Sequence, residues 1–132
     1  MWRNTYPLTS VQLKNFETAF AFNITLVFRD FLMEHNGGVP TPGTFPTSGS
    51  NRRIQRFLNF YENISPSGAW AINRRLREKI GPKRIIFGVD SLGNFLCLER
   101  SYKRQFVVLW NHLTGEFEPC LWDIPAFLRG IG

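Results

Sequence analysis

Apolar and polar residues alternate at helical spacing in the first third of the chain. Thr9-Ser10-Val11-Gln12 matches a capping box, in which the Thr hydroxyl accepts a hydrogen bond from the backbone N–H three residues later and the Gln side chain reaches back. We therefore predict a helix from this motif to about Phe20. Thr25 is placed to cap a second helix. His35-Asn36-Gly37-Gly38 predicts the end of that helix, since Asn and Gly tolerate left-handed backbone.

The middle of the chain is less regular. Residues 39–51 are rich in Pro, Gly, Ser and Thr and predict a loop. The apolar spacing over residues 54–61 fits either a strand or a short helix, so both interpretations stay open. Ser65-Pro66 predicts the start of a third helix, with Ser as the cap and Pro in the first turn, and Gly81-Pro82 predicts its end.

The pattern changes to that of strands after residue 84. Three β-prone runs over residues 85–89, 95–98 and 106–110 are separated by polar, turn-like segments, which predicts an antiparallel meander. Residues 117–121 predict a short last strand, and Asp123 is placed to cap a helix over residues 124–128 that ends at Gly130. Helices followed by strands predict an α+β fold with an antiparallel sheet, or a mixed one, flanked by helices.

The composition is that of a folded domain. The chain has 132 residues, of which 43% are hydrophobic and 15% aromatic, so we predict one domain over residues 1–132 rather than a disordered chain. No stretch has the roughly 20 apolar residues that a membrane helix needs, and the first residues lack a signal-peptide pattern, which predicts a soluble, cytoplasmic protein. Cys97 and Cys120 lie in apolar runs, which indicates buried, reduced thiols.

Positive charge is concentrated in the middle third of the chain. The formal net charge is +6, and residues 50–84 alone hold nine Lys and Arg against two acidic residues. Such an Arg-rich segment fits a surface that binds a polyanion such as nucleic acid. A solvated helix face or an acidic protein partner explains the same charge. Arg52, Arg53 and Arg56 form a separate cluster that we expect on one rim of the sheet.

The sequence contains no pattern typical of an enzyme. His35 and His112 have no metal-ligand spacing, and Asp90 and Glu99 bracket a turn with no acid–base partner nearby in the sequence. Glycine patterns that bind phosphates or dinucleotides are missing as well. We therefore predict a protein that is not an enzyme and that holds no metal or cofactor.

Aromatic residues divide into core and surface candidates. Three tryptophans lie in apolar runs and are predicted core residues: Trp70, Trp110 and Trp122. Tyr61 and Tyr102 lie beside basic residues and are predicted to be exposed, as is Arg104. Because Tyr and Arg contribute much of the binding energy at protein interfaces, these residues are candidates for partner contact. The full set of candidate partner-binding residues is Arg52, Arg53, Arg56, Tyr61, Tyr102 and Arg104.

The order of these signals resembles the SUKH superfamily, the Smi/Knr-type domain, over nearly the whole chain. Three motifs carry the resemblance. They are the Asn36-Gly37-Gly38 helix stop, the Asp90-Ser91-Leu92-Gly93-Asn94 hairpin before an apolar strand, and the Val107-Val108-Leu109-Trp110 strand before Asn111-His112. The chain departs from the family where Ile24-Thr25 and Phe28 replace the usual Leu-Pro and Tyr of the second helix.

The resemblance implies an α+β domain without catalytic residues that acts by binding another protein. Bacterial members are similar to immunity proteins that neutralise a cognate polymorphic or contact-delivered toxin, and fungal relatives are scaffolds of cell-wall signalling. Asn36, Gly37, Gly38, Asp90, Gly93 and Trp110 are then structural motif residues. The basic charge conflicts with inhibition of a nuclease, whose substrate site is itself basic, so either the partner is acidic or the binding face lies outside residues 50–84.

Overall fold

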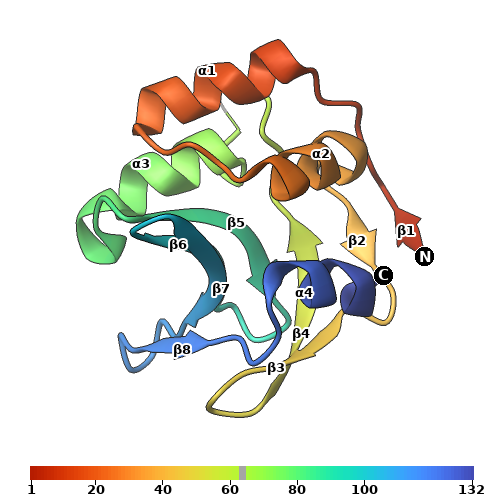
Figure 1. The fold of residues 1–132 in the computed structure, drawn as a ribbon, viewed down its shortest axis with the longest axis vertical. Coiled ribbons are helices and arrows are strands. Elements are labelled where there is room, and N and C mark those ends of the chain that lie inside the picture. The colour runs from red at the N-terminus through yellow and green to blue at the C-terminus, as the bar shows by residue number, and fades with distance from the viewer. Residues whose placement is uncertain (63–64) are drawn as a thin grey trace.

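Within the part of the chain that the structure describes, the fold combines four helices with two antiparallel sheets, as the α+β prediction requires (Figure 1). The computed structural model describes residues 1–62 and 65–132. The helices are α1 (Ser10–Phe20), α2 (Leu26–His35), α3 (Ala69–Ile80) and α4 (Ile124–Ile131). The strands are β1 (Trp2–Arg3), β2 (Val39–Pro40), β3 (Thr44–Pro46), β4 (Asn51–Phe57), β5 (Arg84–Asp90), β6 (Phe95–Ser101), β7 (Arg104–Trp110) and β8 (Phe117–Pro119).

The main sheet has six strands in the order of the sequence, from β3 to β8, and every neighbouring pair is antiparallel. Its two ends also meet. The Ser48 N–H donates to the Pro119 carbonyl at 3.0 Å, and the Leu121 N–H donates to the Pro46 carbonyl at 3.0 Å. The sheet therefore curls until the segment after β3 pairs with the segment after β8, through an antiparallel bridge between Thr47 and Cys120.

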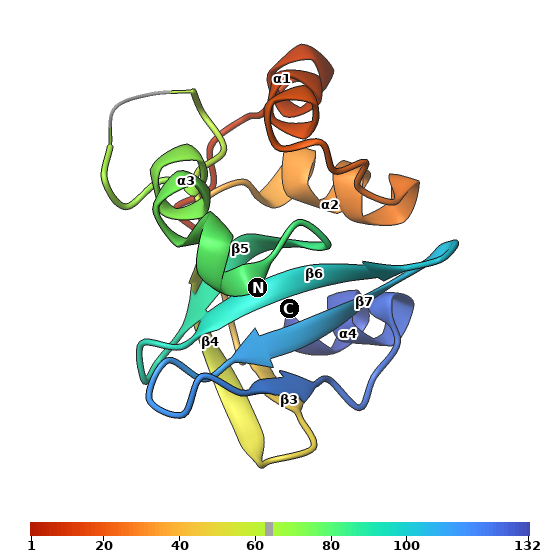
Figure 2. The same cartoon turned by 90° about the vertical axis from the view of Figure 1, so that its left-hand side faces the viewer.

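Helices cover both sides of this curled sheet. Figure 2 shows α1, α2 and α3 on one side of β6 and α4 on the other. Phe87 of β5 joins the two groups, since its ring lies 4.9 Å from Phe28 of α2 and 6.1 Å from Phe127 of α4, between ring centres. All three phenylalanines are fully buried, so one aromatic core connects helices from both ends of the chain.

The first helix and its connection to α2 are specified locally. The capping box at Thr9 is confirmed: Gln12 N–H donates to the Thr9 hydroxyl at 3.1 Å, and Thr9 N–H donates to the Gln12 side chain at 2.8 Å. Glu17, which is buried, accepts hydrogen bonds from the Ile24 N–H at 2.7 Å and from Arg29 Nε at 3.1 Å. This carboxylate therefore holds the turn between the two helices.

Two predicted helix starts are wrong in detail. Thr25 occupies the cap position of α2, but its side chain makes no capping hydrogen bond, and its N–H donates instead to the Gln105 side chain of β7 at 2.9 Å. The third helix begins at Ala69 with Gly68 as its cap, not at Ser65-Pro66. The Ala69 N–H donates to the Asn59 carbonyl at 2.8 Å, so a long-range bond fixes the start of the helix.

Three further predictions need correction. The predicted loop over residues 39–51 contains β2 and β3, and the undecided segment is strand β4 followed by irregular chain. Helix α4 continues through Gly130 to Ile131 instead of ending before it. Trp122 and Cys120 are half-buried, not core residues, because they follow β8 at the place where the sheet edges meet.

Candidate protein-binding surface

The predicted basic cluster on β4 is divided between different surroundings. Arg52 donates to both carboxylate oxygens of Glu118 in β8, at 2.8 and 2.7 Å, and is mostly buried. Arg53 is exposed on the opposite face of the strand. Arg56 is half-buried and reaches the Ser67 carbonyl before α3 at 3.4 Å. The expectation of one shared rim is therefore wrong: Arg52 is structural, and Arg53 is the member of the cluster that is open to a partner.

The predicted tyrosines also differ in their exposure. Tyr61 is half-buried against the core, and its hydroxyl donates to the Pro7 carbonyl at 2.6 Å, so it ties the N-terminal segment to the domain. Tyr102 is fully exposed at the turn between β6 and β7, with a left-handed φ of 56°. Arg104 is exposed at the start of β7. These two residues lie at the hairpin tip, apart from the β4 cluster.

Asn36 and its two glycines connect α2 to the end of β4. Asn36 is fully buried, and its side-chain oxygen accepts the Phe60 N–H at 2.7 Å. Its backbone is not left-handed, whereas Gly37 has a φ of 74° that favours glycine. The Gly38 carbonyl accepts the Phe57 N–H at 2.8 Å, so the helix stop has a structural role.

The two remaining motifs meet at one end of the sheet. Asp90, which is buried, accepts hydrogen bonds from the backbone N–H and side chain of Asn94, at 2.7 and 3.0 Å. The Asn94 side-chain oxygen in turn lies 2.7 Å from His112 Nδ1. Trp110 stacks between the rings of Phe95 and Phe117. These motif residues fix the β5–β6 turn, where Gly93 has a φ of 84°, against the β7–β8 turn.

The outward side of the β3–β4 hairpin carries the most complete candidate surface. Side chains alternate along strands, so Thr44 and Pro46 of β3 share this side with Asn51 and Arg53 of β4. A hollow of about 330 Å³ lies on one side of the hairpin, against Trp122, and another of about 210 Å³ lies on the other side, against Leu92. Both hollows are lined by Thr44 and Asn51, so they adjoin. We call this set, Thr44, Pro46, Asn51, Arg53, Leu92 and Trp122, the β3–β4 surface.

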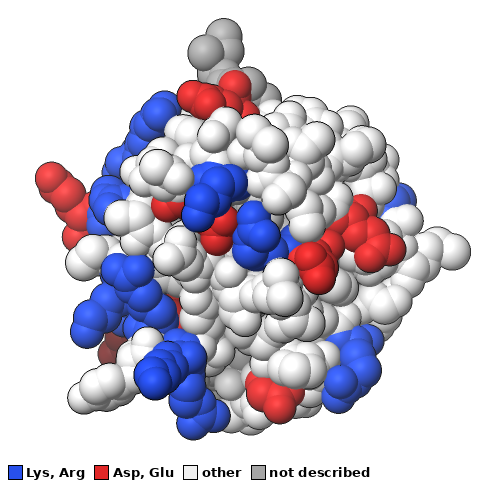
Figure 3. Space-filling model, turned by 45° about the horizontal axis from the view of Figure 1, so that its top comes forward, with Lys and Arg blue, Asp and Glu red and all other residues white. Residues whose placement is uncertain are grey.

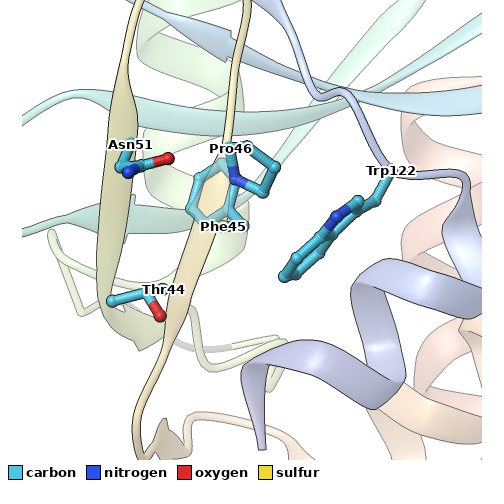
Figure 4. Close-up of a pocket in the computed structure, with 5 residues that line it drawn as sticks. All are labelled: Thr44, Phe45, Pro46, Asn51 and Trp122. Atoms are coloured by element: carbon cyan, nitrogen blue, oxygen red, sulfur yellow. The ribbon is translucent and has the colours of Figure 1, made fainter.

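Trp122 forms one wall of the larger hollow. Figure 4 shows its indole ring facing Phe45 and Pro46 across the opening, with Thr44 and Asn51 on the strands behind. The ring packs so closely on Gly130 of α4 that a Cβ at that position would overlap it. The glycine therefore makes room for the ring, and the closure of the sheet places the ring beside β3.

Hydrogen bonds across the sheet closure join the β3–β4 hairpin to β8. Glu118 accepts hydrogen bonds from Arg52 and from the Thr47 hydroxyl, the latter at 2.9 Å. Burial by itself would raise the pKa of Glu118, but these hydrogen bonds outweigh it and hold the pKa below its usual value. The carboxylate is therefore charged at neutral pH, and it fixes the hairpin that presents Arg53.

Sequence analysis missed Trp122 as a surface residue and Asn73 as a structural one. Trp122 lies in an apolar run, and the long-range closure of the sheet leaves it half-buried beside β3. The buried Asn73 of α3 accepts the Ile86 N–H at 2.7 Å and donates to the Ile86 carbonyl at 2.9 Å. The sequence did carry a signal for Asn73, because this polar residue lies inside the apolar stripe of a predicted helix.

A second groove lies between α2 and α4. It has a volume of about 350 Å³ and is lined by Val27, Phe31, Pro125 and Leu128, with charged residues at its rim. Val27 is 47% exposed, although it is apolar. None of the predicted partner-binding residues lines this groove. Its apolar walls nevertheless make it the alternative candidate to the β3–β4 surface for contact with a partner.

Comparison with known families gives a match over most of the chain. The model of the SUKH_6 family, described as SMI1-KNR4 cell-wall, matches residues 11–128. The chain belongs to the SUKH superfamily. The matched range includes all three motifs that carried the resemblance, and it includes the β3–β4 surface. Neither the curated proteins nor the solved structures gave a match to this SUKH chain.

Within residues 1–62 and 65–132, no group of three or more His, Cys, Asp and Glu side chains is arranged to hold a metal ion. No helix in the same residues has the length and apolar character needed to cross a membrane.

Proposed function

We propose that this SUKH protein is a non-catalytic binding domain that neutralises a cognate protein toxin, in the manner of bacterial immunity members of its superfamily. Family membership supports a binding role, and the β3–β4 surface supplies the residue types that such a role needs. Trp and Arg are enriched among the residues that dominate binding energy at interfaces. Trp122 and Arg53, on either side of Thr44 and Asn51, are the observation on which the proposal rests.

The shape and charge of the surface indicate the chemistry of the partner. The hollow beside Trp122 accepts an apolar side chain, and Arg53 beside the second hollow favours a carboxylate on the partner. The β3–β4 surface has no acidic residue of its own, since the neighbouring Asp90 is buried and hydrogen-bonded. A partner with an apolar projection beside an acidic residue therefore fits best.

The experiment tests protection and binding together. The chain is co-expressed with a toxin-like domain encoded beside its own gene, and growth is measured along with complex formation by the purified proteins. We expect protection by the unaltered chain and its loss in the double variant Trp122→Ala/Arg53→Glu. Lys14→Glu, at an exposed position on α1, is the matched charge-reversal control and should protect fully.

Other outcomes would contradict parts of the proposal. Full protection by the double variant, with loss in Val27→Glu at the exposed wall of the α2–α4 groove, would move the contact to that groove. A stable complex with a partner that is not toxic would favour the alternative role of a cell-wall-regulator-like scaffold. Failure to protect against any neighbouring toxin-like domain, or turnover of a substrate by the purified chain, would contradict the immunity function.

A further inference from the structure

The positive charge of the protein lies on one side. Residues 74–84 and 99–104 together hold nine of the 16 Lys and Arg and two of the ten Asp and Glu, a net charge of +7. The rest of the chain has a net charge of −1. Two short segments therefore account for the basic character of the whole molecule.

The fold brings these two segments together. The Arg100 N–H donates to the Lys83 carbonyl at 2.9 Å, and Arg84 pairs with Glu99 across strands β5 and β6. Arg77 of α3 and Arg100 of β6 both reach the C-terminal end of α1, at the carbonyls of Phe20 and Ala21. Figure 3 shows Lys and Arg side chains gathered on the left of the view, the side on which α3 lies in Figure 1. We call residues 74–84 and 99–104 the basic face.

Much of this charge is free to bind a ligand. Arg77, Arg84 and Arg100 are used in the fold, because each donates to a backbone carbonyl. Five other cations are exposed, and within the described part of the chain they have neither an ion pair nor a side-chain hydrogen bond: Arg75, Lys79, Lys83, Lys103 and Arg104. Placing so many unpaired like charges together costs stability, which an anionic ligand would offset.

An aromatic side chain stands at the edge of this charge. Tyr102 is the residue with the highest exposure among the large hydrophobic side chains, and it lies between Ser101 and Lys103 at the β6–β7 turn. Its ring has both faces open. In proteins that bind single strands, a basic surface follows the phosphates while exposed aromatic rings stack on the bases.

We propose that the basic face binds a single-stranded nucleic acid, with its cations on the phosphates and Tyr102 stacked on a base. This activity is separate from the β3–β4 surface and does not depend on the immunity function. It also revises the prediction for residues 50–84, because Arg52 is paired with Glu118 and Arg53 belongs to the β3–β4 surface.

The residues of the basic face favour nucleic acid over a membrane surface. Apart from Tyr102, the basic face has no exposed large hydrophobic side chain. A helix that lies on a bilayer needs an apolar side to insert, and the apolar side of α3, including Trp70 and Ile72, is buried in the core. Six of the nine cations are Arg, whose planar group matches phosphate oxygens in pairs.

The experiment measures binding of a fluorescein-labelled 20-nucleotide oligothymidine by fluorescence anisotropy between 25 and 200 mM NaCl. With about five phosphates neutralised, the slope of log K against log salt is about −3.5, so the affinity should fall roughly a thousandfold over this range. In Arg75→Gln/Lys79→Gln/Lys83→Gln the slope should be less steep by about 2. Lys14→Gln/Arg129→Gln, which removes two charges outside the basic face, should bind like the unaltered chain.

The role of Tyr102 has its own variants. Tyr102→Ala should lose at least about fivefold in affinity with an unchanged salt slope, and Tyr102→Phe should bind normally.

No binding at 25 mM NaCl, or equal weakening in the control variant, would overturn the proposal. Displacement of the oligonucleotide by polyglutamate as readily as by unlabelled oligothymidine would also overturn it, in favour of an acidic protein. Binding to phosphatidylserine vesicles alone would overturn it in favour of a membrane. The variant Trp122→Ala/Arg53→Glu should retain binding, which separates this test from that of the immunity function.

Discussion

Glu118 joins the two ends of the main sheet through a single carboxylate. It lies on β8, and its partners Arg52 and Thr47 lie on and beside the β3–β4 hairpin. The side chains of Arg52 and Glu118 are only 13% and 16% exposed. Removing one partner of such a pair leaves the other poorly solvated, so a change at this position costs more than the loss of an exposed ion pair would.

Glu118→Gln should destabilise the protein by about 1–3 kcal/mol at pH 7, because Arg52 loses its charged acceptor. The pKa of Glu118 is lower in the folded protein than its usual value of 4.5, so its stabilisation is present above pH 4.5 and disappears as the pH falls through the folded pKa. Urea unfolding at pH 7 and at pH 3 measures both effects. The difference between variant and unaltered chain should shrink at pH 3, and a difference that does not change with pH would contradict this role.

The candidate site was predicted only in part at the level of single residues. Arg53 and Tyr102 are exposed as expected, since charged and turn residues usually are. Arg52 and Arg53 are adjacent in the same stretch of sequence. Only the pairing of Arg52 with Glu118, 66 positions away, makes the surroundings of the two side chains different. Trp122 has the apolar neighbours of a core residue. Their surroundings are set by strand pairing between distant segments, which leaves no mark on the local sequence.

At the level of elements, the side chains of Asn73 and Arg84 attach α3 to the sheet. The side chain of Asn73 bonds to both the N–H and the carbonyl of Ile86, as the backbone of a neighbouring strand would. The pairing of β5 with β6 shifts its register between Ile86 and Gly88. Ile86 itself keeps its register partner Cys97 in β6, and the bonds from Asn73 fix where α3 lies on β5.

Asn73→Leu should reduce the free energy of unfolding by about 2–4 kcal/mol, since it leaves two buried backbone groups of Ile86 unsatisfied. Asn73→Asp keeps an acceptor for the Ile86 N–H, so it should reduce the free energy of unfolding by less than Asn73→Leu does. Chemical denaturation followed by tryptophan fluorescence measures both. Arg74→Leu, at the next and exposed position of α3, is the matched control and should change stability by less than about 1 kcal/mol.

Most elements could be predicted from local sequence, and their junctions could not. The capping box of α1, the Asp123 cap of α4 and the three strands of the meander depend on neighbouring residues, and all are confirmed. The start of α3 depends on a bond from Ala69 to Asn59, and β2 and β3 form in a Pro-rich segment because they pair with β1 and β4. Tertiary contacts override local preference at these places.

At the scale of the whole molecule, charge is distributed unevenly. The basic face has a net charge of +7 while the rest of the chain has −1. At 10 mM salt the screening length is about 30 Å, so its cations repel one another across the entire face, whereas at 0.15 M it is about 8 Å. The three ion pairs to Glu17, Glu99 and Glu118 are partly or largely buried and are screened less.

Salt should therefore stabilise the protein. We expect the free energy of unfolding to rise by about 0.5–1 kcal/mol between 10 and 150 mM NaCl, and to rise less in Lys79→Gln/Lys83→Gln, which relieves part of the repulsion. Urea titrations at the two salt concentrations measure this change. Lys14→Gln, outside the basic face, should keep the full salt response, and a fall in stability with salt would contradict the explanation.

The meeting of the segments after β3 and β8 also determines how other chains can approach. At Pro46 and Pro119 the backbone carbonyls of both outer strands already accept hydrogen bonds, from Leu121 and Ser48. The edges of β3 and β8 therefore leave few unpaired backbone groups to which a peptide could add as a further strand. Copies of the protein cannot readily pair edge to edge at these strands for the same reason. A partner approaching these edges would therefore be recognised through side chains, which evolution can exchange one at a time while the frame beneath them stays constant.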